Sequence, residues 1–438
     1  MLNSFAGRCF CLRASLLTGL FAGLALSSAA ARAQKPTAAP IVLHAARLLE
    51  VDTGVMLQPG EILVEGERIR AVGRSVEHPE GAKVIDLGDA ALLPGLIDAH
   101  VHLFLHPGAE DLQTVLESVP WRTILAEQAA KADVMAGFTA ERDMGTEGAG
   151  SADTAVKRAI DQGLIPGPRL RISGNAIDLL GGHEDANHFN PAQHVLSNAD
   201  YANSADEIVA VMREQHKEGS TFAKIYETGP DRMIDGVLHT PYQYSESELA
   251  AAVEEAHRLG TLVGVHAMGE PGTLYAAQAG VASIDHATQL SDETMRLMRE
   301  KHIPAVPTFA IMKYFADHRE SQDQAAGESA MLDYKIAEFK KQIAAGVPFA
   351  VGSDVGPFPH GTQAVEMELM VRYGMKPLAV LQADFLNGAR LMGLEGRIGE
   401  LKPGYFADVV AVPGNPLDDI TVTEHVSFVM KNGAVVRQ

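Results

Sequence analysis

Between residues 94 and 392, short apolar runs alternate with amphipathic stretches of helical period. Three of these stretches end in Gly, as helix C-termini often do: residues 204–219, 245–260 and 334–346. The apolar runs predict strands over residues 95–100, 138–144, 170–174, 222–226, 262–266, 283–286, 305–308 and 349–354. Eight strands that alternate with helices predict an α/β fold with a (β/α)8 TIM barrel. A doubly wound sheet is the alternative, but no Gly-rich phosphate-binding motif follows the first strand.

The regions on either side of this alternation have a β pattern instead. Residues 41–93 and 397–438 hold short β-rich runs separated by Gly. Within the second region, Asn432-Gly433 is typical of a tight hairpin turn. We expect the two regions to pair into one small β-sandwich. The predicted boundaries are residues 34–93 for its first part, 94–392 for the barrel and 393–438 for its second part.

The first 33 residues have the pattern of a cleaved secretory signal peptide. Arg8 and Arg13 precede a long apolar run, and Ala31-Arg32-Ala33 forms an A-x-A cleavage site. An uncleaved membrane anchor is the alternative. No later segment has the roughly 18 uninterrupted apolar residues of a spanning helix. We therefore expect a periplasmic or secreted protein with no membrane association after cleavage.

Composition narrows the chemistry that remains. Both cysteines, Cys9 and Cys11, lie in the predicted signal, so the mature chain has no disulfide, thiolate ligand or cysteine nucleophile. Any metal ion must be bound by His, Asp, Glu or a modified Lys. The formal charge of −20 becomes −23 when the three arginines of the signal are removed. This charge argues against nucleic acid as a partner.

Polar residues follow the predicted strands at the end where barrel active sites lie. His100 and His102 stand two apart on the first strand, so their side chains point the same way. Each residue alone has a simpler explanation, such as a core histidine or, for Asp354, a helix N-cap. Together they would converge on the barrel axis as N and O ligands suited to zinc or a similar ion: His100, His102, His266, His286 and Asp354.

Lys224 stands in an apolar setting on the fourth predicted strand. Burial of a bare ammonium is costly, so one interpretation is a lysine that reaches the surface or pairs with an acid. The other is a neutral amine that reacts with CO₂ to form a carbamate, whose two oxygens can bridge two metal ions. The sequence alone leaves both open.

The order H-x-H, Lys, His, His, Asp resembles the binuclear members of the amidohydrolase superfamily. LLPGLIDAHVHL, residues 92–103, is similar to the entry motif of that family, and GELKPGYFADVVAVPGNPLDDI, residues 399–420, to its return into the β-sandwich. The resemblance implies two divalent ions, with Zn²⁺ expected, bridged by N6-carboxylated Lys224. His100, His102 and Asp354 would bind one ion, and His266 and His286 the other. Asp384 stands where the family more often has Thr, which predicts altered capping or packing but no loss of a ligand.

The same resemblance implies hydrolysis of an amide bond by a water that both ions activate, with Asp354 as general acid and base. Prolidase-like (Xaa-Pro dipeptidase) and ochratoxinase-like members cleave the bond to a C-terminal amino acid, so the expected substrate is a dipeptide or N-acyl amino acid. His183 and Tyr226 are candidate substrate-binding residues. The alternatives are that His183 is a solvated loop histidine and that Tyr226 is a packed structural tyrosine. Phe309, Ile311 and Met312 either line an apolar pocket or pack in the core.

Two other functions stay open. One is a cyclic-amide hydrolase of the imidazolonepropionase or dihydroorotase kind. The other is a barrel that has lost its chemistry and serves as a binding scaffold. Relatives in this superfamily are often multimers, so we expect a homo-oligomer that acts on a small-molecule substrate.

Overall fold

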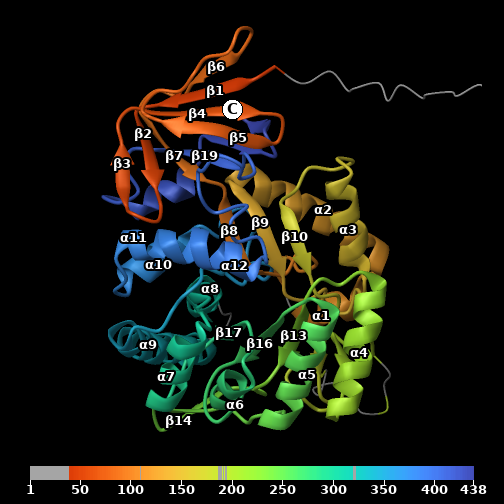
Figure 1. Ribbon diagram of the computed structural model, residues 1–438. Helices are drawn as coiled ribbons and strands as arrows, with labels where there is room; N and C mark the ends of the chain where they lie inside the picture. The colour runs from red at the N-terminus through yellow and green to blue at the C-terminus, as the bar shows by residue number, and fades with distance from the viewer. Residues whose placement is uncertain (1–38, 109, 186–189, 191, 193–194, 319–321) are drawn as a thin grey trace, which may run out of the picture. The chain divides into compact units, whose positions relative to one another are not determined.

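The computed structural model describes residues 39–108, 110–185, 190, 192, 195–318 and 322–438 (Figure 1). The predicted signal peptide, residues 1–33, lies outside the described residues. In the part of the chain that is described, no helix has both the length and the apolar character to cross a membrane.

Parallel strands form the centre of the fold, as the alternating pattern predicts. One sheet has the order β10 (Arg169–Ile172), β9 (Phe138–Asp143), β8 (Leu96–Val101). The other has the order β12 (Ala199–Tyr201), β11 (Ala176–Asp178), β13 (Ala223–Tyr226), β16 (Val263–Ala267), β17 (Ser283–His286), β18 (Ala305–Val306). The third predicted strand is split, because β10 pairs with β9 whereas β11 pairs with β13. The chain thus passes from one sheet to the other after Ile172.

The eighth predicted strand, residues 349–354, does not form a regular strand. Isolated parallel bridges join Val101 to Val355 and Ala305 to Phe349, so this segment still lies between β8 and β18. Its ladder is interrupted because the backbone N–H and hydroxyl of Ser353 both donate to the carboxylate of Asp98. The approach to β8 is also very close, since a Cβ at Gly352 would lie 2.9 Å from the Cβ of His100.

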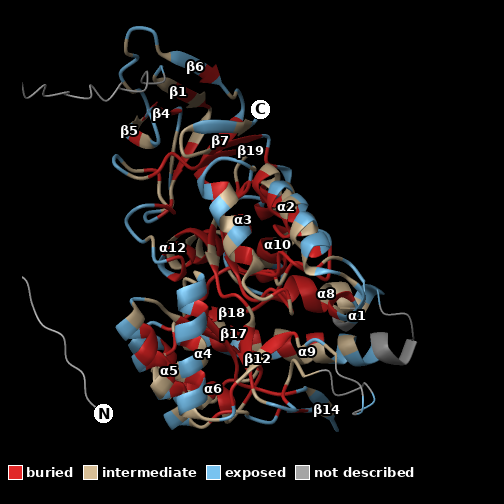
Figure 2. Ribbon diagram, turned by 90° about the vertical axis from the view of Figure 1, so that its right-hand side faces the viewer, coloured by how far each residue is buried: buried red, intermediate tan, exposed pale blue. Residues whose placement is uncertain are grey.

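Helices follow most of the strands, and their ends have the expected signals. Ser245 begins α5 with a capping box to Glu248, and Gly260 ends it in the left-handed conformation. Figure 2 shows pale blue on the outward side of α4 and red on β17 and β18. The helices are α1 (Glu110–Leu116), α2 (Val119–Ala136), α3 (Ala152–Asp161), α4 (Ala205–Glu218), α5 (Glu246–Leu259), α6 (Gly272–Ala279), α7 (Asp292–Lys301), α8 (Phe309–His318), α9 (Gln322–Ala345), α10 (Val365–Arg372), α11 (Pro377–Gln382) and α12 (Gly388–Leu391).

Segments from both ends of the described chain pair in one sheet. Its order is β21 (Ala434–Arg437), β20 (Phe428–Lys431), β19 (Val409–Pro413), β7 (Ala90–Pro94), β2 (Arg47–Glu50), β3 (Val55–Leu57). The antiparallel β19–β7 ladder is the join that the sequence predicts. A second sheet has the order β5 (Arg68–Gly73), β4 (Gly60–Glu65), β1 (Ile41–Ala45), β6 (Lys83–Asp86). Apolar residues of both sheets, such as Leu43, Ile62, Leu92 and Phe428, belong to one buried cluster.

Asp384, the departure from the family pattern, is fully buried in the π-helical segment η1 (Ala383–Asn387). Its Oδ1 accepts a hydrogen bond from the backbone N–H of Ile97 at 3.3 Å. Burial raises the pKa of this carboxyl group well above its usual range. Asp384 therefore supports the start of β8, at the opposite end of that strand from His100.

Candidate metal centre and active site

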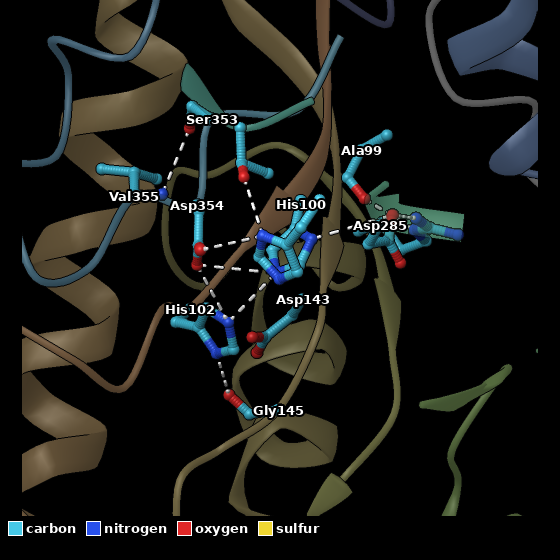
Figure 3. Close-up of polar contacts among 12 residues, drawn as sticks. Ala99, His100, His102, Asp143, Gly145, Asp285, Ser353, Asp354 and Val355 are labelled. Atoms are coloured by element: carbon cyan, nitrogen blue, oxygen red, sulfur yellow. Dashed lines mark hydrogen bonds and ion pairs between the residues drawn. The ribbon is translucent and has the colours of Figure 1, made fainter. Parts of the chain in front are cut away.

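His100, His102 and Asp354 form a compact triangle where β8 ends (Figure 3). The two Nε2 atoms are 3.3 Å apart, and Asp354 Oδ1 lies 3.5 Å from that of His100 and 3.3 Å from that of His102. Ligands bound at 2.0–2.1 Å in tetrahedral geometry lie about 3.3–3.4 Å from one another. The triangle therefore has the dimensions of one face of a zinc site, and this group could hold a metal ion.

The other three predicted ligands lie beside this triangle. The His286 ring is 5.1 Å from that of His100 and 4.4 Å from that of His266, centre to centre. His286 Nδ1 forms a hydrogen bond with the Thr308 hydroxyl at 2.8 Å. Its Nε2 is therefore available to bind a metal ion. Within the described chain, Lys224 Nζ and His266 Nε2 have no hydrogen-bond partner, although both are buried. Buried polar atoms without partners fit a centre that binds further ions.

A single small cavity of about 150 Å³, here called the inner cavity, collects these groups. All eight residues predicted for the site line it: His100, His102, His183, Lys224, Tyr226, His266, His286 and Asp354. The structure thus brings together side chains from β8, β13, β16 and β17 and the loops that follow. It also adds Glu110, Glu147 and Glu184, which were not predicted.

Burial dominates the electrostatics of the imidazoles. It lowers the pKa of His100 to about 4, and the nearby charge of Lys224 acts in the same direction. Burial likewise lowers the pKa values of His266 and His286 well below the usual range. Neutral imidazoles are the form that binds metal ions.

His102 and Asp354 differ from this pattern because they face opposite charges. Burial alone would lower the pKa of His102, but hydrogen bonds to Asp354 and Glu147 raise it well above its usual range. Burial alone would raise the pKa of Asp354, but the charges of His100 and His102 hold it well below its usual range. A cation bound between them would take the place of the proton on His102.

Carboxylates lie behind the imidazoles of His100 and His102, and sequence reasoning missed them. Asp285 Oδ1 lies 3.8 Å from His100 Nδ1, and Arg142 binds the same oxygen at 2.9 Å. Glu147 Oε1 lies 3.0 Å from His102 Nδ1. His102 Nδ1 also contacts the Gly145 carbonyl at 3.2 Å. In metal sites, partners at Nδ1 direct the Nε2 of a histidine towards the ion. The sequence feature that could have identified Asp285 is its position directly before His286 on a buried strand.

Strained backbone collects at the carboxyl ends of the strands. Five non-glycine residues there have positive φ angles: Glu147 (48°), His286 (68°), Ala287 (42°), Thr308 (52°) and Asp354 (63°). Such conformations cost about 1–3 kcal/mol each and persist where the surroundings enforce them. Three of the five line the inner cavity, which marks this region as the functional end of the molecule.

His183 and Tyr226, the two predicted substrate-binding residues, lie next to each other. Their rings stack at 5.0 Å with an interplanar angle of 10°. The Gln243 side chain joins their backbones, because its Oε1 accepts from His183 N–H and its Nε2 donates to the Tyr226 carbonyl. The Tyr226 hydroxyl donates to Glu184, whose pKa burial raises well above its usual range.

Of the three apolar residues near the seventh strand, only two face a cavity. Ile311 lines the inner cavity, and Ile311 and Met312 line a neighbouring one. Phe309 instead packs edge to face against Phe339 and Tyr373 in the core. On α8 the three residues cannot all face the same way, because successive helical positions are about 100° apart.

The family model of the amidohydrolase family matches residues 91–436, so the chain belongs to the amidohydrolase family. Ochratoxinase from Aspergillus niger is 29% identical over 429 residues, which cover 90% of this chain and 86% of that protein. A crystal structure of a Xaa-Pro dipeptidase with bound methionine in the active site matches with a TM-score of 0.83 at 29% identity, over 91% of this chain and 100% of the other.

Imidazolonepropionase from Geobacillus sp. (strain WCH70) is 26% identical over 415 residues, 87% of this chain and 91% of that protein. The chain is therefore an enzyme, a hydrolase that acts on amide C–N bonds, with a TIM-barrel-type fold. This excludes the non-catalytic scaffold as its function.

Proposed function

We propose that this protein hydrolyses the amide bond to a C-terminal amino acid, in a dipeptide or an N-acyl amino acid, at a centre of two divalent metal ions. One observation carries the proposal. Lys224 Nζ is buried without a hydrogen-bond partner in the described chain, and it lines the same cavity as five imidazoles and Asp354. A carbamate on Lys224 would turn this costly amine into a bridging ligand.

In this proposal His100, His102 and Asp354 hold one ion, His266 and His286 hold the other, and N6-carboxylated Lys224 joins them. When bound, divalent ions supply Lewis-acid polarisation of the substrate carbonyl and lower the pKa of water. Asp354 is ionised at neutral pH, so its carboxylate can accept the proton of the attacking water and pass it to the leaving amine. Asp285 and Glu147 keep the imidazoles of His100 and His102 in place during the reaction.

His183 and Tyr226 bind the carboxylate of the substrate amino acid in this proposal. The Tyr226 hydroxyl then transfers its hydrogen bond from Glu184 to the substrate. Tyr226→Phe is expected to raise KM for an N-acyl amino acid by roughly 10-fold, the equivalent of one hydrogen bond to a charged group, with a smaller effect on kcat. An unchanged KM would remove Tyr226 from this role.

Further features belong to the same proposal. The metal is Zn²⁺, the two central sheets close into an eight-stranded barrel through residues 349–355, and the two terminal sheets form a β-sandwich. The domain boundaries are those predicted from the sequence. The chain is exported to the periplasm or medium with cleavage after Ala33, and it assembles as a homo-oligomer.

The test is a panel of N-acyl-L-amino acids, dipeptides and cyclic amides, assayed with the metal-loaded full-length protein and with His100→Ala. We expect release of a free amino acid from the linear substrates, lost by at least 100-fold in the variant. Equal activity of the two proteins, or no turnover of any linear substrate, would contradict the proposal.

A cyclic-amide hydrolase is the second candidate, and the similarity to imidazolonepropionase favours it. Ring opening gives one product from one substrate, whereas the leading proposal gives two. Mass analysis of the products from the same panel separates them. Turnover confined to cyclic substrates would establish the second candidate in place of the first.

A further inference from the structure

The imidazoles of the proposed metal centre come from two separate sheets. His100 and His102, which would bind one ion, lie on β8 and directly after it, in the three-stranded sheet. His266 and His286, which would bind the other ion, lie on β16 and β17 in the six-stranded sheet. The centre therefore spans the junction between the sheets. The distance between the two sets of ligands depends on how firmly these sheets are joined next to the centre.

Arg142 on β9 joins the two sheets close to both sets of ligands. Its Nε donates to the carbonyl of Ala99 on β8 at 2.6 Å. Its two terminal nitrogens donate to Ser283 Oγ and Asp285 Oδ1 on β17, both at 2.9 Å. Ala99 directly precedes the first histidine ligand of β8, and Asp285 directly precedes the histidine ligand of β17. One planar guanidinium thus connects the two strands at the positions next to their ligands.

The surroundings of this guanidinium are buried and tightly packed. Arg142 and Asp285 are both almost completely buried, so their ion pair is shielded from water. A Cβ at Gly264 on β16 would lie 3.1 Å from Arg142 Nη1, closer than the optimum of about 3.5–4.0 Å for nonbonded atoms. Gly264 therefore keeps open the space that the guanidinium occupies. Asp285 extends the contact to the centre, because its Oδ1 lies 3.8 Å from His100 Nδ1 (Figure 3).

We propose that Arg142 is a positioning residue of the metal centre, which fixes the spacing between the ligands of the two ions by joining β8 to β17. This inference rests on the proposed function, because it requires a second ion. The simpler explanation is that the charge of Arg142 compensates the buried carboxylate of Asp285. A lysine would supply the same charge, but it lacks the fork that reaches three acceptors on two strands. Arg142→Lys therefore separates the two explanations.

The experiment titrates Co²⁺ into the full-length protein after removal of metal with a chelator, and follows visible absorption and electron paramagnetic resonance. Two Co²⁺ ions that share a bridging ligand couple magnetically, so the resonance of the pair depends on their spacing. The unmodified protein should bind two ions per chain as a coupled pair. Arg142→Lys should bind the tighter ion with an affinity within about 3-fold of that value, because the imidazoles of each ion come from one sheet. It should bind the second ion at least about 10-fold more weakly and show no coupling.

A second variant and a matched control accompany Arg142→Lys. Gly264→Ala changes no charged group, but its methyl group must displace the guanidinium, so it should weaken binding of the second ion by roughly 3-fold or more. Arg171→Lys is the control. Arg171 pairs with Arg142 in the β10–β9 register, but its guanidinium donates to the carbonyls of Met392 and Thr221. It should leave both affinities and the coupling unchanged. Circular dichroism of each metal-free variant verifies folding.

The possible failures are distinguishable. If the unmodified protein binds a single Co²⁺ ion, or two that do not couple, the proposed binuclear centre is wrong and the role of Arg142 is withdrawn with it. If the unmodified protein forms the coupled pair and Arg142→Lys forms it with the same affinities, the proposed function stands and Arg142 only compensates the charge of Asp285. Equal weakening of both ions in folded Arg142→Lys would also overturn the positioning role. If Arg142→Lys does not fold, Gly264→Ala decides by the same measurements.

Discussion

Two lysines, Lys224 on β13 and Lys335 on α9, are buried to nearly the same degree, with 1% and 2% of their surface exposed. In the described chain neither Nζ has a hydrogen-bond partner, and burial lowers both pKa values, that of Lys335 to about 8. Their surroundings differ. Lys224 lines the inner cavity with five imidazoles, whereas Lys335 lies 5.4 Å from the Phe309 ring, with Glu366 as its main opposite charge.

The difference teaches that burial of an amine does not by itself indicate a metal-bridging group. Both lysines violate the rule that buried charges are paired and hydrogen-bonded. In the proposed function, Lys224 avoids this cost by carboxylation and metal binding. For Lys335 the solution is electrostatic, with a lowered pKa and a nearby carboxyl group that can share its proton. Substitutions at the two positions should therefore have different consequences.

The largest expected effect is on metal content and rate. Lys224→Met should reduce bound zinc below two ions per chain and lower kcat/KM by roughly 10²–10³-fold, because the bridging ligand is lost. Lys335→Met, the same change at the same burial, should keep two ions and activity within about 10-fold. Metal analysis and steady-state kinetics of both variants check this, and equal metal content in the two would remove the distinction between the lysines.

The next effect concerns stability and pH at Lys335. Unfolded Lys has a pKa of 10.5, above the folded value of about 8, so the unfolded chain binds this proton more tightly. Between pH 8 and 10.5 the wild type should gain stability relative to Lys335→Met, by up to about 3 kcal/mol. Below pH 8, Lys335 should cause no further pH dependence in the difference in unfolding free energy between the two proteins. Denaturant unfolding of both proteins at pH 7.5 and 10.5 measures this difference in unfolding free energy. The same difference at both pH values would show that the pKa of Lys335 is not lowered in the folded protein.

A smaller effect on metal affinity is expected from the carboxylates beside the two lysines, Asp285 beside Lys224 and Glu366 beside Lys335. Asp285→Asn should weaken metal affinity by roughly 10- to 100-fold, because the amide orients His100 less firmly than the carboxylate. Glu366→Gln is the matched control, since Glu366 is equally buried but does not line the inner cavity, and its Oε2 accepts from the Ala310 N–H. Competition with a zinc chelator measures both affinities. Equal affinities for the two variants would contradict a role for Asp285 in holding His100.

The sequence predicted a set of residues that the structure brings together at the inner cavity, because strand ends are local signals. An apolar run that closes on His266 or His286 can be recognised from the run itself. Asp285 and Glu147 could not be assigned in this way, because their roles depend on which imidazole each one meets across strands. Lys335 was not recognised either, since its burial comes from the packing of α9 rather than from the local pattern.

The fold was predicted in outline and missed in two places. The split of the third strand and the irregular eighth segment both arise from side chains that bind backbone groups. Thr221 Oγ1 accepts from the Ile172 N–H, and Asp98 accepts from Ser353. Such long-range hydrogen bonds leave no periodic trace in the sequence. Helices α4 and α5 were predicted to within one residue because their caps are local.

The most direct test of the account is a crystal structure of the zinc-loaded enzyme with anomalous data at the zinc edge. The account predicts two peaks per chain, one within bonding distance of His100, His102 and Asp354 and one of His266 and His286. Carboxylated Lys224 should lie between them. A single peak, or an unmodified Lys224 amine with no contact to either ion, would contradict the binuclear centre.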